Sequence, residues 1–147
     1  MYDYMNGLIT DVRPDGIVLE VNNIGYFINV SNPYTFEINK MSRVYLYQQV
    51  KEDELNLFGF KKKEEKELFL KLINVKGLGC KMALPILATG SINGIMEAIE
   101  RENIAYLKKF PKIGDKLARQ MILDLKGKIG SVHTLFDDNS INYTSNE

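Results

Sequence analysis

The sequence predicts an α+β protein in which a small, closed barrel of five strands precedes an all-helical domain. Three observations support this fold class. Residues 1–60 gather β-branched and aromatic residues into short, partly alternating runs, which is typical of strands. From residue 61 onward, apolar residues recur at helical spacing between glycines. The helical part also carries two copies of one short pattern.

The composition allows a core and limits the chemistry of the protein. The chain has 147 residues, of which 45% are hydrophobic, and this suits one large domain or two small ones. Cys80 is the only cysteine and His133 the only histidine, so an internal disulfide and a multi-cysteine zinc site are excluded. We expect neither a metal nor a cofactor. Because no apolar run reaches about 18 residues and no secretory signal opens the chain, we expect a cytoplasmic protein without a membrane span.

Five segments are predicted to form the barrel. They are residues 5–12, 16–21, 25–30, 43–50 and 55–60. Between the first two, Pro14 fixes φ, and Gly16 is expected to take the positive φ that closes a hairpin. Phe58 and Phe60 are expected to fill the barrel. Five short strands in so few residues indicate an OB-fold, a barrel that often binds nucleic acids.

The residue pattern changes after the last of these strands. Residues 61–75 place Leu68, Leu72 and Val75 on one side of a helix, with charged residues elsewhere. The end of the chain is polar and has no period, which is typical of disorder. The predicted domains are therefore the barrel at 1–61, the helical domain at 62–130, and a disordered linker or tail at 131–147.

The net charge of zero conceals three segments of different sign. Residues 1–60 hold 4 basic and 8 acidic residues, a net charge of −4. Residues 61–130 hold 15 and 8, a net of +7, and residues 131–147 hold 0 and 3, a net of −3. A basic middle segment fits a polyanion-binding module, although a solvated helical surface would carry the same charges.

The stretches VKGLGCKMA (75–83) and FPKIGDKLA (110–118) are two copies of one pattern, 35 residues apart. Each copy predicts a helix, a tight turn around an apolar residue, and a second helix. The matched pairs are Leu72 and Leu107, Val75 and Phe110, Leu78 and Ile113, Gly79 and Gly114, Lys81 and Lys116, and Ala83 and Ala118.

The second helix of each copy predicts an anion site. The first amides of a helix lack intrahelical partners and carry the positive end of the helix dipole, and Lys81 or Lys116 adds a full charge beside them. The alternative is a repeat of helical hairpins that only packs. The spacing does not match a phosphate-binding P-loop, so ATP binding is not expected.

These motifs, in this order, resemble the RuvA family over about residues 1–130. The resemblance rests on NIGYFINV (23–30), VKEDELNLFGF (50–60) and two helix-hairpin-helix motifs, VKGLGCKMALPIL and FPKIGDKLARQMILDLK. It implies sequence-independent recognition of four-way (Holliday) DNA junctions in recombination and DNA repair, including the SOS response. It also implies a homotetramer, one or two per junction, that is the non-catalytic subunit of a helicase complex with a RuvB-like ATPase and works beside a RuvC-like resolvase.

The resemblance assigns roles to particular residues. The implied DNA contacts are Lys76, Gly77, Gly79, Lys81, Lys112, Gly114 and Lys116, with Arg119 as a further cation on nearly the same helix face as Lys116. An acidic pin near the junction centre falls on Glu52 and Asp53, where carboxylates repel phosphates and disfavour plain duplex. No catalytic residue is implied.

The second motif departs from the family pattern at three positions. Lys112 stands where the family usually has glycine, Asp115 where a lysine usually follows the turn, and Gln120 where an arginine is usual. Asp115 favours the start of a helix but repels phosphate, and Arg119 is expected to compensate.

Two other functions remain open from the residues alone. A helix-hairpin-helix lyase or glycosylase would need a catalytic lysine or aspartate in a pocket. A general single-strand DNA binder would need aromatic platforms on a basic barrel, whereas residues 1–60 are acidic. The resemblance also implies a C-terminal third domain, outside these 147 residues, that recruits the motor. We therefore expect the chain to bind and open junctions as a tetramer without coupling the motor.

Overall fold

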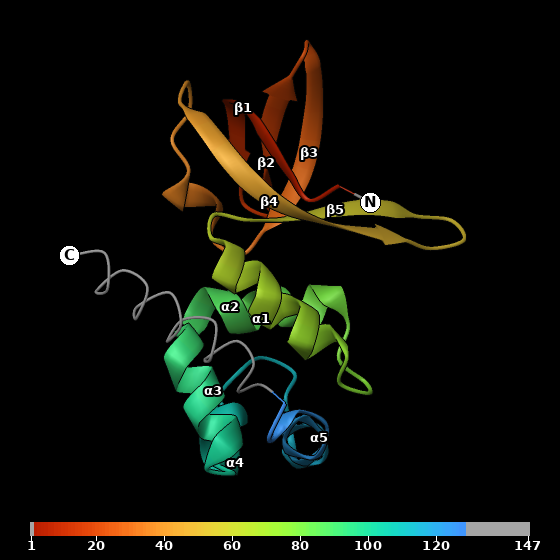
Figure 1. The fold of residues 1–147 in the computed structure, drawn as a ribbon, viewed down its shortest axis with the longest axis vertical. Helices are drawn as coiled ribbons and strands as arrows, with labels where there is room; N and C mark the ends of the chain where they lie inside the picture. Colours follow the sequence, from red (N-terminus) through yellow and green to blue (C-terminus); the bar gives the residue numbers. More distant parts are fainter. Residues whose placement is uncertain (1, 129–147) are drawn as a thin grey trace, which may run out of the picture. The chain divides into compact units, whose positions relative to one another are not determined.

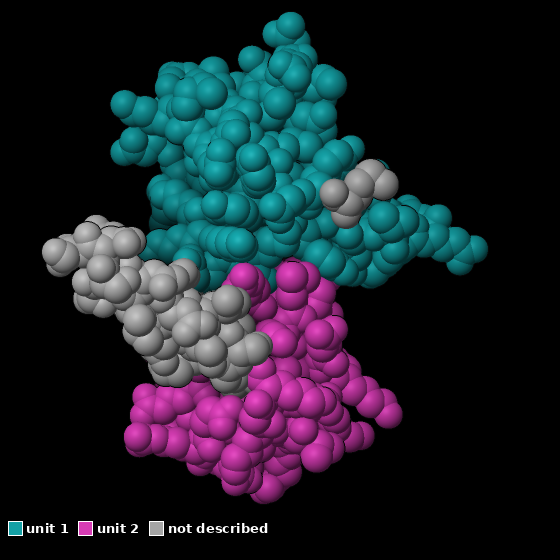
Figure 2. All heavy atoms as spheres, viewed as in Figure 1, with its two compact units in different colours: residues 1–66 teal, residues 67–147 magenta. Residues whose placement is uncertain are grey.

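The computed structural model describes residues 2–128, which form two compact units (Figure 2). Unit 1 comprises residues 1–66, and unit 2 begins at Glu67. The expected disorder of residues 131–147 lies outside the described residues.

Unit 1 is a closed, five-stranded barrel. Its strands are β1 (Tyr4–Arg13), β2 (Gly16–Val21), β3 (Ile24–Val30), β4 (Met41–Val50) and β5 (Leu55–Phe60), with a single 3-10 turn at Pro33–Thr35. They follow the order β1-β2-β3-β5-β4 around the barrel, and β1 pairs with β4 to close it (Figure 1). Strands β3 and β5 run parallel, while the other neighbours are antiparallel. The predicted OB-type barrel and its five strands are confirmed.

The barrel interior is apolar, because alternate residues of a strand point to the same face. Its buried residues are Ile9, Ile17, Leu19, Ile28, Val30, Phe36, Val44 and Leu46. Gly59 pairs with Leu46 and also faces inward, since a Cβ added there would lie 2.4 Å from Cγ2 of Ile28. Phe58 and Phe60 flank Gly59, so they lie on the opposite face of β5, where they are also buried. The prediction that these two rings fill the barrel is therefore wrong.

Gly16 closes the first hairpin for a different reason from the one predicted. The described residues with positive φ do not include Gly16. Instead, a Cβ at Gly16 would lie 2.3 Å from the carbonyl oxygen of Ile28, so close approach of two backbones requires glycine. Positive φ occurs at the next turn, where Asn22 and Asn23 take φ values of 51° and 66°, as a two-residue primed hairpin turn needs.

Unit 2 is helical. Helix α1 (Lys63–Ile73) leads into it and is followed by α2 (Cys80–Thr89), α3 (Ile92–Glu100), α4 (Ile104–Leu107) and α5 (Asp115–Leu125). Its core contains residues with 0% exposure from all of these helices, namely Leu72, Ile86, Ile95, Ile99, Leu107 and Met121. Among residues 2–128, no single helix is long and apolar enough to cross a membrane; α2 and α3 reach that composition only as a pair bent by 107°.

Candidate nucleic-acid interface

The 35-residue repeat of the sequence is also a repeat of the structure. In each copy a helix enters a turn, and the turn enters a second helix: α1 into α2, and α4 into α5. Three backbone hydrogen bonds, each from an amide to a carbonyl, recur 35 residues later. In the first copy they run from Val75 to Leu72 (3.0 Å), from Leu78 to Val75 (3.0 Å) and from Ala83 to Gly79 (3.0 Å). In the second copy they run from Phe110 to Leu107 (3.3 Å), from Ile113 to Phe110 (3.2 Å) and from Ala118 to Gly114 (2.9 Å). The matched apolar residues are buried in both copies. We call residues 75–79 the first turn and 110–114 the second turn.

Both turns pass through the left-handed backbone region at the same position. Gly77 has φ of 92°, and Lys112, its counterpart 35 residues later, has φ of 65°. Glycine takes this conformation freely, whereas for a side chain such as lysine it costs about 1 kcal/mol. The second turn thus keeps the geometry of the first despite the departure from glycine, at a cost in stability.

Replacing Lys112 by glycine should raise the free energy of unfolding by about 1 kcal/mol, because the left-handed strain is removed. Thermal or urea unfolding of Lys112→Gly against wild type measures this. Asparagine also tolerates the left-handed region, so Lys112→Asn should recover part of the gain and serves as the matched control. A Lys112→Gly variant less stable than wild type would contradict the expectation.

The two glycines that end the turns have another role. Gly79 and Gly114 have extended backbones, with φ of −95° and −99°, and an added Cβ at either would meet nothing within 4 Å. Neither the backbone conformation nor packing among residues 2–128 therefore requires glycine there. Glycine at these two positions leaves the surface over the first turn of α2 and of α5 open to another molecule.

The capping of the helices supports this interpretation. Helices α3 and α4 begin with side-chain caps: Oγ of Ser91 accepts from the amide of Gly94 (2.9 Å), and Oδ1 of Asn103 accepts from that of Tyr106 (3.1 Å). Helices α2 and α5 have no side-chain cap. Among α2, α3, α4 and α5, the two helices that follow the turns are thus the ones whose first amides are left for an external acceptor.

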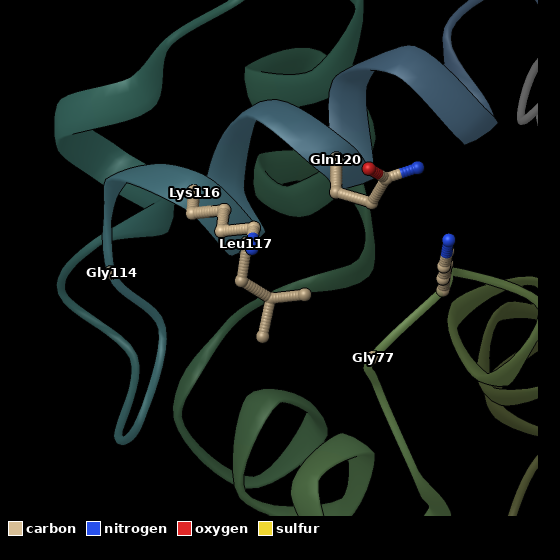
Figure 3. A pocket seen from close by; sticks show the side chains of 6 residues that line it. Gly77, Gly114, Lys116, Leu117 and Gln120 are labelled. Carbon is tan, nitrogen blue, oxygen red and sulfur yellow. The ribbon is translucent and has the colours of Figure 1, made fainter.

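The two turns border one cavity of about 460 Å³. Its lining residues are Lys76, Gly77, Gly114, Lys116, Leu117 and Gln120 (Figure 3). The structure therefore brings four of the predicted contact residues together around this cavity. The other four, Gly79, Lys81, Lys112 and Arg119, are exposed but do not line it. Lys76, Lys81, Lys112 and Lys116 form no ion pair with another described residue, so their charges are available to a ligand.

Asp115, the acidic departure in the second motif, has a partner. Its Oδ1 lies 2.9 Å from Nζ of Lys108, at the end of α4. The hydrogen bond from Lys108, together with that charge, lowers the pKa of the Asp115 carboxyl, and the charge of Arg119 lowers it further. The repulsion that Asp115 exerts on an anion at the start of α5 is therefore partly offset by neighbouring cations.

Asp124 contacts the first turn, which the sequence did not reveal. Its Oδ2 accepts a hydrogen bond from the backbone amide of Lys76 (3.0 Å), and its Oδ1 accepts one from Nε2 of Gln120 (2.9 Å). These two bonds, the first being the larger cause, lower the pKa of Asp124. Spacing of four residues along α5 could suggest the pair with Gln120. Nothing local could suggest the bond to a turn 48 residues away.

The predicted acidic pin lies at the tip of the β4–β5 hairpin, which extends beyond the rest of the barrel in Figure 1. The loop is closed by a hydrogen bond from the amide of Lys51 to the carbonyl of Glu54 (2.8 Å), and these two side chains also lie 3.8 Å apart as an ion pair. Glu52 and Asp53 are exposed and form no ion pair with a described residue. The two carboxylates at the tip are therefore left uncompensated.

A five-stranded barrel joined to a tandem of glycine-containing helical hairpins, with cations beside two uncapped helices, defines a class of nucleic-acid-binding protein. Among residues 2–128, no three metal-ligating side chains lie together. Residues 1–59 match the family model described as the RuvA N-terminal domain, and residues 69–128 match that of the SAM-like helix-hairpin-helix tandem.

Curated relatives agree with both matches. The chain is 49% identical over 150 residues to a protein of Pediococcus pentosaceus, covering 100% of this chain and 75% of that one. It is 50% identical over 131 residues to a protein of Streptococcus sanguinis, and 49% identical over 131 residues to one of Streptococcus pneumoniae. These two alignments cover 88% of this chain and 67% and 66% of the relatives. All three are named Holliday junction branch migration complex subunit RuvA. The chain belongs to the RuvA family.

Proposed function

We propose that this chain recognises four-way DNA junctions without reading their sequence. The observation that carries the proposal is the pair of uncapped helix starts, α2 and α5, each preceded by a glycine that no contact within the described part of the chain requires. Both turns border the same cavity, and two lysines lie at its edge. The names of the curated relatives supply the DNA structure, the Holliday junction.

The proposed contacts are to phosphates. Oxygens of the DNA backbone accept hydrogen bonds from the first amides of α2 and α5, and the absence of a Cβ at Gly79 and Gly114 lets them approach. Lys81 and Lys116 add charge within the first turn of each helix. The strained conformation of Lys112 supports a contact as well, because strain that persists at an exposed position points to a functional demand. Such contacts position DNA but carry no sequence information.

The assembly and its partners follow from family membership and are part of the proposal. The chain acts as a homotetramer, one or two per junction, in the bacterial cytoplasm. It contributes no catalysis, because ATP hydrolysis belongs to a RuvB-like partner within the branch migration complex. A RuvC-like resolvase acts on the same junctions during recombination and repair.

The pin excludes plain duplex in this proposal. Glu52 and Asp53 carry uncompensated charge on a projecting hairpin, so DNA backbone that passes over this tip is repelled. At the centre of an open junction the DNA strands diverge, and this leaves space for the tip of the β4–β5 hairpin.

Replacing Glu52 by glutamine and Asp53 by asparagine should tighten binding of plain duplex by roughly tenfold, because two repulsive charges are removed from the DNA-facing tip. Junction binding should stay the same or tighten less. Titration of both DNAs at one stated salt concentration measures the ratio. The matched control is Glu54→Gln, whose carboxylate is already paired with Lys51 and whose effect should be smaller. Duplex affinity as low as in wild type would show that repulsion is not what excludes duplex.

A gel-shift comparison of four-way junction, duplex and single strand tests the proposal as a whole. We expect the junction to bind most tightly, whatever its sequence. Lys81→Ala should also lower the slope of log affinity against log salt by roughly 0.9 per protomer that contacts DNA, because one phosphate contact is lost. Preference for single strand, or cleavage of an abasic duplex, would support one of the two other functions instead.

A further inference from the structure

The first turn is held against α5 by contacts that come from the second copy of the repeat. The carboxylate of Asp124 binds the amide of Lys76, and Cδ1 of Leu117 lies 3.6 Å from the place of a Cβ at Gly77. Both contacts flank the cavity between the two turns. The distance between the two turns therefore depends on the contacts that α5 makes with the first turn.

This hydrogen-bonded contact has no equivalent on the other copy. The residue 35 positions before Asp124 is Thr89, and its hydroxyl donates to the carbonyl of Pro85 within α2 (2.9 Å). The second turn is held instead by the ion pair of Asp115 with Lys108. The two turns thus share a backbone shape but are fixed by unrelated side chains.

The charge of Asp124 opposes the proposed ligand. A carboxylate on α5, the helix that carries Lys116, repels phosphate and by itself weakens DNA binding. Gln120 donates to one of its oxygens, and the Lys76 amide to the other, so the carboxylate is oriented by two hydrogen bonds. The hydrogen bond of Asp124 to the first turn therefore favours DNA binding, whereas the charge of Asp124 weakens it. Variants that remove one without the other can separate the two effects.

We propose that Asp124 is a positioning residue for DNA binding: it fixes the first turn on α5 and so sets the spacing at which both turns reach phosphates. This inference rests on the proposed function. Without the hydrogen bond to Lys76, the first turn moves relative to the start of α5, and one of the two contacts with DNA is lost in any given encounter.

The test compares Asp124→Ala with Asp115→Ala, because each variant removes one hydrogen-bonded carboxylate from α5 and raises the net charge by one. Asp124→Ala should weaken junction binding by roughly tenfold, the loss expected for one hydrogen bond to a charged group. Asp115→Ala leaves the hydrogen bond between α5 and Lys76 in place and frees Lys108 for a phosphate, so it should weaken binding less than Asp124→Ala does, or tighten it. Asp124→Asn keeps an acceptor oxygen and should recover most of the lost affinity.

The amide of Lys76 should exchange its hydrogen faster in Asp124→Ala, while the exchange of the Ile113 amide in the second turn should not change.

Tighter binding by Asp124→Ala, or no recovery by Asp124→Asn, would overturn the proposal. So would unchanged exchange at Lys76. A failure of the proposed function looks different, because the glycine and lysine variants of the two turns would then leave junction binding unaltered. If those variants weaken binding and Asp124→Ala does not, the turns contact DNA but Asp124 does not position them.

Discussion

Replacing Gly79 and Gly114 together by alanine should weaken binding of a four-way junction by about 100-fold or more, with little change in stability. Each new methyl group stands over a helix start that is otherwise open, so a phosphate can no longer reach the amides there. Loss of even one hydrogen bond to a charged group per turn accounts for about tenfold. The fold should tolerate the change within about 1 kcal/mol, because both backbones are extended and no atom of the described residues lies within 4 Å of either added Cβ.

Binding isotherms and unfolding curves of the same samples measure the two expectations. Gly127→Asn is the matched control: Gly127 lies in the same unit, has φ of 84° and leaves room for a side chain. Asparagine tolerates that conformation, and Gly127 belongs to neither turn, so junction affinity should not change. Affinity of the double alanine variant equal to that of wild type would show that DNA does not approach these helix starts.

Gly16→Ala should destabilise the barrel by about 3 kcal/mol, the upper end of ordinary overpacking. The added Cβ would lie 2.3 Å from the carbonyl oxygen of Ile28 on β3, and backbone cannot rotate away as a side chain can. A drop of roughly 10 °C in the melting temperature is the expected readout. The single variant Gly79→Ala, with nothing within 4 Å, is the control and should melt close to wild type. Equal melting temperatures for both would contradict the close approach of β2 and β3 at this residue.

The sequence predicted the strands and both turns because their signals are local. Alternation of apolar residues marks a strand without reference to its neighbours, and the repeat marks each turn by its own glycine and apolar residue. The same locality explains the errors. A turn glycine suggests a positive φ at Gly16, whereas the structure requires glycine there because the carbonyl of Ile28 on β3 lies too close for a Cβ. Phe58 and Phe60 alternate correctly, yet only the pairing of Gly59 with Leu46 shows which face is inside.

The same difference between local signals and long-range contacts applies to the candidate site. The repeat singles out the pairs Gly79 with Gly114 and Lys81 with Lys116, because these positions match in the two copies, whereas Lys76, Gly77 and Lys112 come from the resemblance to RuvA. The ion pair of Asp115 with Lys108 and the hydrogen bond of Asp124 to Lys76 were not predicted, because each joins segments whose proximity exists only in the folded chain. The sequence therefore indicates the candidate residues for DNA contact, but not the residues that hold them in place.

If DNA phosphates bind at the uncapped starts of α2 and α5, as proposed, DNA binding becomes part of the folding equilibrium of the helical unit. Serine and asparagine cap α3 and α4 within the chain, whereas in the proposed function the phosphates of bound DNA complete α2 and α5. By mass action, a ligand at 100 times its dissociation constant adds about 2.7 kcal/mol to the stability of the state that binds it. The helical unit should accordingly melt at a temperature that rises with the concentration of DNA, and the first turns of α2 and α5 should be its least ordered helical residues until DNA arrives.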